Sequence, residues 1–429
     1  MGLLRMQAFQ YQDRELFCEG VPVSDIVRKV GSPVYIYSRQ RLISNFRSVE
    51  AGLSNKDHLV CYAVKANGNL NILKIFADMG CGADVVSGGE LALALKAGIP
   101  PEKIVFAGVG KTDDEIEQAA RHQILSINAE SLAEISIINQ IAIGLGTTIP
   151  VAIRVNPDIE IESHPYIKTG IEESKFGIVR NRVEEAFQTA ASLPGIRCEG
   201  IHCHIGSMIM DAEPFVRATE VMAHLVQSLR MQGISIRHVD IGGGLGLDYA
   251  RVVDDGNLTV HEDNTALTPA DLFRSIFPVL DGLGVRLLFE PGRYLVADAG
   301  ALVTRVTLVK KNEKIKFVVV DAGMNDLIRP SLYDSYHQIV VVNQTEQDVE
   351  TVHVVGPICE AGDFFARDRS LPRVNRGDLL AVMAAGAYGY SLSSNYNGRL
   401  RPPEVLVEGD TFRLIRERER LDDLWRGIL

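Results

Sequence analysis

The chain has 429 residues, 46% of them hydrophobic, so it can bury a large core and form more than one domain. Its 44 basic and 55 acidic residues give a formal net charge of -11, which disfavours nucleic acid or an anionic membrane as the main partner. Six cysteines without a CxxC pair, no recognisable signal peptide and no apolar run of about 20 residues predict a cytoplasmic protein with reduced thiols.

From about residue 34, short apolar runs alternate with helical stretches. The predicted strands are Leu59–Ala63, Ala83–Val86, Ile104–Phe106, Leu125–Ile127, Val151–Val155, Cys198–His204, His238–Ile241 and Val285–Phe289. The predicted helices are Leu70–Met79, Gly88–Lys96, Asp113–Arg121, Ser131–Ile141, Asn181–Leu193, Glu213–Met231 and Pro269–Leu283. This alternation predicts a parallel (β/α)8 barrel of the TIM type over residues 34–297, and a doubly wound open sheet is the alternative.

The pattern changes after residue 297, where strands follow one another with little helix between them. The predicted strands are Ala301–Val309, Lys316–Val320, Gln338–Val342, Thr351–Val355, Leu379–Met383, Glu404–Val407 and Thr411–Leu414. This pattern predicts a second, all-β domain with a sandwich or barrel architecture, made of residues 298–429 together with residues 1–33.

Lys65 is the first candidate site residue, and it directly follows the first barrel strand in Tyr62-Ala-Val-Lys65-Ala-Asn67. Catalytic groups of such barrels lie at the C-terminal ends of the strands, where Asp84, His204 and Glu290 also occur. A partly desolvated lysine at this position can act as a nucleophile. The alternative is a solvated lysine at a strand end.

A glycine-rich run, Gly242 to Gly246, follows the seventh predicted strand. It lacks the last glycine, the acidic partner and the helix of a dinucleotide-binding fingerprint, so that function is excluded. The backbone N–H groups of Gly243 and Gly244 suit a phosphate group, with the Ser207 hydroxyl as a further donor. A plain tight turn is the alternative.

His202 and His204 lie on one face of their predicted strand, and Cys203 lies on the other. Two such residues without a nearby third ligand are weak evidence for zinc, so we predict no metal site. We expect His204 to stack against a flat cofactor ring and His202 to be a core histidine.

The segment Glu290-Pro-Gly292-Arg293 ends the eighth predicted strand. A carboxylate there can pair with the protonated ring nitrogen of pyridoxal phosphate (PLP), a cofactor that also needs a lysine and a phosphate cradle. A structural pair of Glu290 and Arg293 is the alternative. In the β domain, Arg329 can join Arg293 in binding a carboxylate, whereas Cys359 alone is most simply a buried thiol.

These motifs resemble the PLP-dependent fold type III decarboxylases, a family that includes ornithine, arginine and diaminopimelate decarboxylases. The similarity extends over nearly the whole chain, from Pro33 to Val407. It implies a PLP-binding barrel followed by a β domain. The cofactor-binding residues that it implies are Lys65, Asp84, His204, Ser207, Gly243, Gly244, Glu290, Gly292, Arg293 and Tyr388.

Within this family the chain is most similar to the diaminopimelate decarboxylases. The segments that carry this similarity are His164–Gly170 with Ser174–Gly177, Met324–Tyr333, Cys359-Glu360, and Gly386–Gly389 with Ser394–Asn397. The resemblance implies a carboxy-lyase that converts meso-2,6-diaminopimelate to L-lysine and CO2 in lysine biosynthesis. It also implies a homodimer, because the family's Cys-Glu pair enters the active site of the partner subunit.

The resemblance implies Lys65 and Cys359 as catalytic residues, and Arg293, Arg329, Tyr333, Glu360 and Tyr388 as substrate-binding residues. Arginines beside a glutamate also suit a substrate whose distal end carries both a carboxylate and an ammonium group. A decarboxylase of another basic amino acid, a PLP-dependent racemase and a PLP carrier remain as alternatives.

Overall fold

The structure is a computed structural model that describes residues 7–159, 175–254, 266–345 and 348–429. The chain divides into two compact units. The barrel unit comprises the described parts of Phe46–Leu247 and Thr265–Tyr294, and the β unit comprises those of Met1–Asn45, Asp248–Asn264 and Leu295–Leu429.

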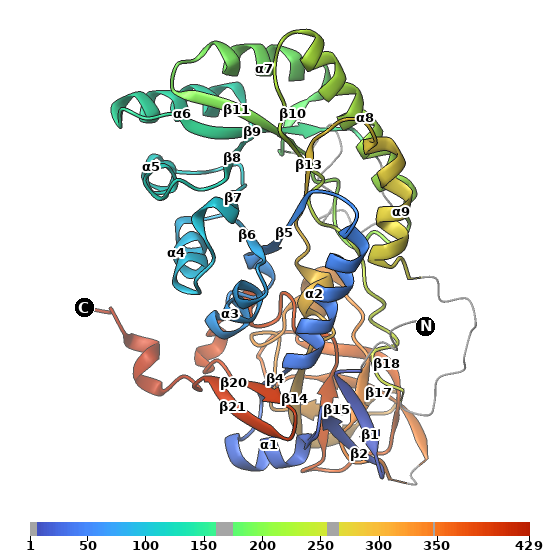
Figure 1. Ribbon diagram of the computed structural model, residues 1–429. Coiled ribbons are helices and arrows are strands. Elements are labelled where there is room, and N and C mark those ends of the chain that lie inside the picture. The colour runs from blue at the N-terminus through green and yellow to red at the C-terminus, as the bar shows by residue number, and fades with distance from the viewer. Residues whose placement is uncertain (1–6, 160–174, 255–265, 346–347) are drawn as a thin grey trace. The chain divides into compact units, whose positions relative to one another are not determined.

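Eight parallel strands of the barrel unit form a closed ring, coloured from blue through green to yellow in Figure 1. In order of pairing they are β5 (His58–Ala63), β6 (Gly82–Val85), β7 (Ile104–Phe106), β8 (Ser126–Ala129), β9 (Ile149–Asn156), β11 (Ile196–His202), β12 (His238–Asp240) and β13 (Arg286–Phe289). The ring closes because β13 pairs with β5. β10 (Ile178–Val179) pairs with β9 beside the ring. This topology confirms the predicted (β/α)8 barrel and excludes the open sheet.

The helices of the barrel unit are α3 (Leu70–Asp78), α4 (Gly88–Lys96), α5 (Asp113–His122), α6 (Leu132–Gly144), α7 (Val183–Ser192), α8 (Glu213–Met231) and α9 (Pro269–Leu280), and α2 (Arg39–Leu53) precedes β5. Five helices of the barrel unit begin at a polar cap residue whose side chain accepts a backbone N–H, whereas α7 and α8 have no such side-chain cap. Thr112 and Glu115 form a capping box at the start of α5, and the Ser131 hydroxyl accepts the Glu134 N–H at the start of α6. Among the described helices, none combines the length and the apolar character needed to cross a membrane.

The barrel strands are buried along almost their whole length, as expected for parallel strands covered on both faces. Every residue of β6, β7, β8 and β12 is buried. The register places Asp84 beside Ala63, and Asp240 beside His202. The polar residues at the C-terminal ends of the strands therefore face the same end of the barrel.

The β unit contains a large sheet and a small one. The large sheet has the order β18–β17–β15–β14–β4–β20–β21, and β19 pairs with both β14 and β16. Its strands are β4 (Val34–Ser38), β14 (Gly300–Lys311), β15 (Lys316–Val320), β16 (Ile339–Val341), β17 (Val349–Val355), β18 (Phe364–Pro372), β19 (Leu379–Val382), β20 (Glu404–Glu408) and β21 (Thr411–Arg416). The small sheet contains β1 (Phe9–Gln12), β2 (Glu15–Cys18) and β3 (Val21–Pro22), followed by α1 (Val23–Val30). A separate sheet domain is therefore confirmed.

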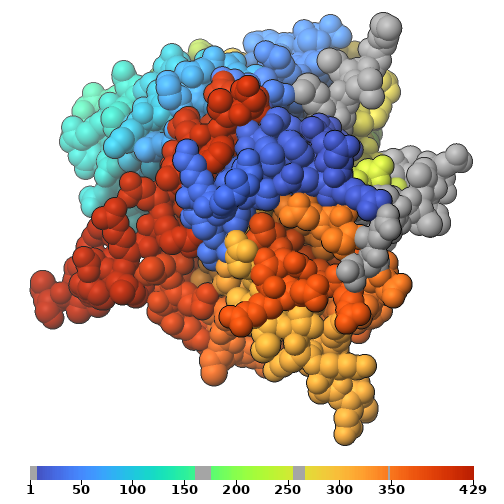
Figure 2. Space-filling model, turned by 90° about the horizontal axis from the view of Figure 1, so that it is seen from below, coloured from blue at the N-terminus to red at the C-terminus, as the bar shows by residue number. Residues whose placement is uncertain are grey.

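The N-terminal residues pack within the β unit. The Leu16 N–H donates to the Val342 carbonyl at 2.8 Å, and the Gly20 N–H donates to the Gly409 carbonyl at 2.9 Å. Figure 2 shows these blue N-terminal residues against the orange and red C-terminal part.

Several strands, among them β4 and β18, have no counterpart among the predicted strands. β4 pairs with β14 and β20, although its residues fall inside the predicted barrel range of 34–297. All five β4 residues are buried, and a fully buried apolar run has the same pattern in a barrel as in a sheet. β18 was not predicted, because its charged residues Arg367, Asp368 and Arg369 hide the alternation. The domain boundaries stay a prediction.

Candidate active site

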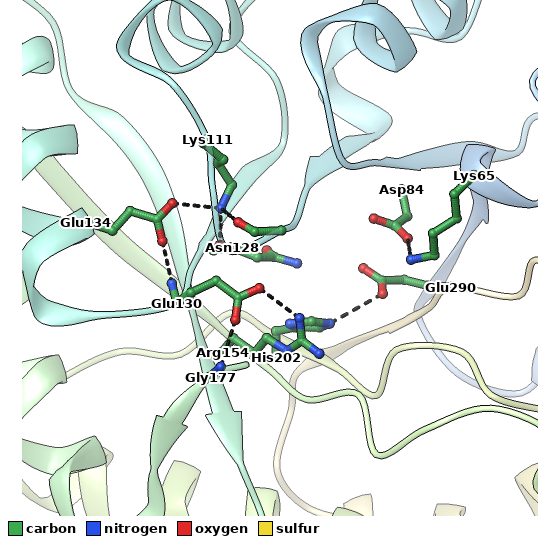
Figure 3. Close-up of polar contacts among 11 residues, drawn as sticks. Lys65, Asp84, Lys111, Asn128, Glu130, Glu134, Arg154, Gly177, His202 and Glu290 are labelled. Carbon is green, nitrogen blue, oxygen red and sulfur yellow. Dashed lines mark hydrogen bonds and ion pairs between the residues drawn. The ribbon is translucent and has the colours of Figure 1, made fainter. Parts of the chain in front are cut away.

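Lys65 lies in a short 3-10 helix, η1 (Val64–Ala66), directly after β5. Its Nζ atom donates a hydrogen bond to Asp84 Oδ2 at 3.0 Å (Figure 3). The Lys65 side chain is 40% exposed, whereas the Asp84 side chain is completely buried in β6. Burial raises the pKa of Asp84 and the nearby Glu290 raises it further, while Lys65 opposes both effects. The carboxylate thus fixes an amine that solvent can still reach.

Glu290 follows β13 and points toward His202 inside the barrel (Figure 3). The His202 Nε2 atom and Glu290 Oε2 form a hydrogen bond at 3.3 Å. Burial alone would raise the pKa of Glu290, but the charge and hydrogen bond of His202 and the charge of Lys65 outweigh it and lower the pKa to about 2. Glu290 is therefore an ionised carboxylate inside the barrel. Its Oε1 atom is buried and has no hydrogen-bond partner among the described residues.

His204 and the glycine run lie in contact. The Gly243 N–H donates to His204 Nδ1 at 3.2 Å, so a neutral His204 carries its proton on Nε2. Burial lowers the pKa of His204 well below its usual value, and the positive charges of Lys65 and Arg154 lower it further. The ring is consequently neutral at physiological pH and offers a flat, uncharged surface.

The backbone at the glycine run leaves no room for side chains. A Cβ atom on Gly243 would lie 2.2 Å from the Glu290 carbonyl oxygen, and one on Gly244 would lie 2.4 Å from the Gly206 carbonyl oxygen. Gly244 also has a φ of 107°, which side-chain-bearing residues rarely adopt. These glycines let the strand ends approach closely.

Ser207 and Arg293 supply further donors in the barrel unit. Arg293 donates from Nε and from one terminal nitrogen to Ser207 Oγ, at 3.3 and 3.1 Å. The Arg293 residue is only 8% exposed. A Cβ atom on Gly292 would lie 3.1 Å from the Cβ atoms of both Ala63 and Ala66, so this segment packs against the Lys65 loop. A guanidinium, a hydroxyl and glycine N–H groups suit a phosphate.

A buried ionic network on the neighbouring strands was not predicted from the sequence (Figure 3). The Lys111 ammonium donates to the Gly108 carbonyl at 2.7 Å, to the Asn128 carbonyl at 2.8 Å and to Glu134 Oε1 at 2.9 Å. The Lys111 side chain is 1% exposed. The other Glu134 oxygen accepts the Glu130 N–H at 2.6 Å. The signal for Lys111 was its place just beyond a predicted strand, the same criterion that selected Lys65.

Glu130 extends this network to β9. Its Oε1 atom accepts from Arg154 at 2.7 Å, and its Oε2 atom accepts the Gly177 N–H at 2.7 Å. An arginine within an apolar strand was a sequence signal that we did not use. Gly177 belongs to the predicted Ser174–Gly177 motif, whose Ser174 lies outside the described residues, as does the whole of His164–Gly170.

The remaining predicted site residues belong to the β unit. Arg329 and Tyr333 lie in α11 (Arg329–Tyr333). Arg329 is 4% exposed, and its guanidinium contacts His337 Nε2 at 2.9 Å and donates to Ser335 Oγ at 3.3 Å. The guanidinium also lies over the Tyr249 ring at 4.6 Å from the centroid. These contacts fix the orientation of the guanidinium.

Cys359 and Glu360 are exposed, contrary to the expectation of a buried thiol for an isolated cysteine. The Cys359 N–H donates to Asn397 Oδ1 at 2.8 Å, and the Tyr396 hydroxyl donates to Glu360 Oε2 at 3.4 Å. The pair is thus presented on the surface of the β unit by a defined loop.

Tyr388 has a φ of 55°, a left-handed conformation that is strained for a bulky residue. Its neighbour Gly386 has no room for a side chain, because a Cβ atom there would lie 1.9 Å from the Val296 carbonyl oxygen. Such strain is typical of functional segments.

Nine predicted residues therefore lie together in the barrel unit, and five lie in the β unit. The barrel group is Lys65, Asp84, His204, Ser207, Gly243, Gly244, Glu290, Gly292 and Arg293. An amine, a buried anion, a neutral imidazole and a phosphate cradle at the C-terminal ends of barrel strands define a barrel enzyme of the PLP-dependent class.

Comparisons with known proteins agree with this class. The family described as "Pyridoxal-dependent decarboxylase, pyridoxal binding domain" matches residues 39–297. The diaminopimelate decarboxylase of Aquifex aeolicus is 44% identical over 96% of this chain and 95% of its own length. That of Pseudomonas aeruginosa is 44% identical over 98% of this chain and 99% of its own length. The chain therefore belongs to the pyridoxal-dependent decarboxylases and, within them, to the diaminopimelate decarboxylase family.

A solved structure agrees with the sequence comparisons. Diaminopimelate decarboxylase from M. jannaschii, solved in complex with L-lysine, superposes with a TM-score of 0.92 at 37% identity. The superposition covers 100% of this chain and 99% of that one. These findings confirm the family that the sequence motifs predicted and its pyridoxal cofactor.

Proposed function

We propose that this protein is a cytoplasmic carboxy-lyase that converts meso-2,6-diaminopimelate to L-lysine and CO2 with PLP, in lysine biosynthesis. The observation that carries this proposal is the similarity to diaminopimelate decarboxylases at 44% identity over almost the entire chain. The barrel geometry supports the proposal independently, because nine of the ten predicted cofactor residues belong to the barrel unit, where Lys65, Asp84 and Glu290 come from the C-terminal ends of strands.

The residues around Lys65 fit the reactive half of PLP. When bound, PLP supplies an aldehyde and a cationic ring that accepts electrons from a breaking bond. Lys65 would hold the aldehyde, since Asp84 fixes its amine at 3.0 Å. Glu290 would hold the ring nitrogen, because its buried Oε1 atom needs a donor and an ionised carboxylate favours a protonated ring.

The phosphate half fits the glycine run. The Gly244 N–H, the Ser207 hydroxyl and the Arg293 guanidinium would bind the phosphate, and the Gly243 N–H, which donates to His204 Nδ1 at 3.2 Å, would exchange that acceptor for a phosphate oxygen. The neutral His204 ring would stack on the cofactor. Gly292 would let the Glu290 segment approach the Lys65 loop.

The other residues would act on the substrate. Arg293, Arg329 and Tyr333 would bind the distal carboxylate, and Glu360 would bind the distal ammonium group. Tyr388 would contact both cofactor and substrate. Lys65 or Cys359 would return a proton to the carbon atom that loses CO2. We further propose a homodimer in which Cys359 and Glu360 serve the partner subunit, which their surface position supports.

The test is CO2 release from the PLP-loaded protein with meso-diaminopimelate, ornithine, arginine and lysine as separate substrates. We expect release from diaminopimelate alone, because a site built for two distal charges rejects an analogue that lacks one by up to about 10⁴-fold. The Lys65→Ala variant is the inactive control. Release from another substrate would overturn the distal-end assignment, and no release from any substrate would overturn the decarboxylase proposal.

Mixing two inactive variants tests the shared site. The Lys65→Ala and Glu360→Ala proteins should regain part of the activity when their subunits exchange, because mixed dimers contain one intact pair of residues. Activity that stays absent after demonstrated subunit exchange would contradict a site built from two subunits.

A further inference from the structure

Asp240 is a buried acid that the proposed mechanism does not use. It ends β12 and lies in register with His202 of β11 and Leu288 of β13. The residue is 1% exposed. Its Oδ1 atom accepts the Gly242 N–H at 2.8 Å, while Oδ2 is buried without a hydrogen-bond partner among the described residues.

A second buried acid lies next to it. One ligand atom each of His202, Asp240 and Glu290 lies within 4.8 Å of the other two. The Glu290 Oε1 atom and the Asp240 Oδ2 atom both lack a donor in the described part of the chain. Two carboxylates this close in a buried site cannot both be ionised at low cost, so one of them holds a proton.

The surrounding groups decide which acid holds it. The titratable groups that act on Asp240 are Cys61 of β5, Asp84 of β6, His202 of β11, Cys203 after it, and Glu290 after β13. Burial raises the pKa of Asp240 well above its usual value, and the Glu290 charge raises it further. Glu290 instead has the His202 donor and the Lys65 charge. The proton therefore belongs on Asp240.

We propose that Asp240 is a positioning residue that stays protonated and donates a hydrogen bond to Glu290, holding Glu290 as the ionised partner of the cofactor ring. A carboxylate has about four lone-pair sites, so Glu290 can accept from His202, from Asp240 and from a ring N–H together. Hydrogen bonds donated to the ionised Glu290 carboxylate lower its basicity. The proton between Glu290 and the cofactor ring therefore stays on the ring nitrogen. This consequence, unlike the proton on Asp240, rests on the proposed function.

Infrared difference spectroscopy tests the proton directly. The full-length protein, with and without cofactor, is compared with its Asp240→Asn variant at neutral pH. Asparagine keeps the shape, an acceptor for Gly242 and a donor for Glu290. We expect the variant to lose the C=O stretch of a protonated carboxylic acid, whereas the matched control Asp84→Asn, whose acid is paired with Lys65, keeps it. Loss of carboxylate bands alone in the Asp240→Asn spectrum would overturn the proposal.

The pH dependence of unfolding gives a second readout. A protonated Asp240 binds one proton more in the folded than in the unfolded protein, so wild-type stability falls as pH rises above the usual Asp value of about 4. Asp240→Asn removes this proton. The ratio of the variant's folding equilibrium constant to that of the wild type should therefore rise about tenfold for each unit by which the pH increases. Parallel curves would contradict the proposal.

Turnover by the PLP-loaded protein tests the consequence for Glu290. Asp240→Asn should retain roughly ten- to a hundredfold more kcat than Asp240→Ala, because only asparagine can still donate to the Glu290 carboxylate. Equal kcat values would refute the positioning role. If the wild type shows the C=O stretch of the protonated acid but does not turn over diaminopimelate, the proposed function is overturned while the assignment of the proton to Asp240 stands. Stoichiometric divalent metal in the purified protein would overturn the proton assignment, because a metal ion needs both acids ionised.

Discussion

The Gly243→Ala substitution should damage the cofactor site, because its added methyl group overlaps the backbone that carries Glu290. The Gly243 Cβ position lies 2.2 Å from the Glu290 carbonyl oxygen and 3.1 Å from the Glu290 carbonyl carbon, and both contacts are backbone. An ordinary contact begins at 3.4 Å, so one backbone must move by about 1 Å. The movement displaces either the glycine run or Glu290 itself.

The expected cost follows from this overlap. Overpacking a well-filled site costs about 1–3 kcal/mol, equivalent to about 5- to 150-fold in an equilibrium constant. Relaxation would shift the Gly243 N–H, which donates to His204, and the carboxylate of Glu290. We therefore expect weaker PLP binding by about that factor, together with a loss of folding stability.

PLP titration by absorbance and urea unfolding of the cofactor-free protein measure the two effects. The matched control is Gly144→Ala, at the end of α6, where a Cβ atom meets nothing within 4 Å. Alanine there should stabilise the protein by about 0.5–1 kcal/mol and leave the PLP Kd unchanged. A Gly243→Ala protein with wild-type Kd and wild-type unfolding midpoint would refute the packing argument.

Four further outcomes follow from the structure. Lys65→Ala should abolish the absorbance of the lysine-bound cofactor near the visible edge, and an unchanged spectrum would refute the lysine assignment. Glu360→Ala should reduce diaminopimelate turnover far more than the PLP Kd, and equal losses would indicate a structural role. Lys111→Met leaves the Glu134 side chain, which is only 11% exposed, without its cation. Unfolding by urea should therefore show a loss of up to about 3 kcal/mol, and an unchanged midpoint would contradict the ionic network. Burial lowers the pKa of His238 to about 4. Below about pH 6.5 the unfolded protein therefore binds a proton at His238 that the folded protein does not bind, so the stability falls by up to about 1.4 kcal/mol per pH unit as the pH decreases toward 4. His238→Gln should flatten this part of the unfolding curve, and identical pH dependence in the two proteins would refute the assignment.

The barrel was predictable because its signals are local. Most strands are short, largely buried runs, and several of the helices between them begin at a cap that is visible in the sequence, as at Thr112 and Ser131. β4 was assigned differently because its partners, β14 and β20, are distant in the chain. Whether a buried apolar run such as β4 joins the barrel or the other sheet depends on which strands it pairs with. Hydrophobic periodicity alone does not reveal those partners.

The candidate site was predictable to the same degree. Residues directly after strands, such as Lys65 and Glu290, were predicted because the active site of such a barrel lies at the C-terminal ends of its strands. The pair of Glu130 and Arg154 was missed, because it depends on the pairing of β8 with β9 across the turn of the barrel. In the sequence, Arg154 is visible only as a charged residue inside an apolar strand, and Glu130 only as an acidic residue that follows a strand.

Several of the unsatisfied polar atoms of the barrel core lie at the candidate site. Asp84 Oδ1, His202 Nδ1, Asp240 Oδ2 and Glu290 Oε1 are all buried without a hydrogen-bond partner among the described residues. Native cores satisfy nearly all buried polar groups, and an unmet one costs about 1–3 kcal/mol, so four within one cluster are not expected from packing alone. A proton on Asp240 would satisfy two of them by joining Asp240 to Glu290. A cationic ring N–H would satisfy Glu290 further, which explains why the barrel concentrates its acids at the end where Lys65 lies.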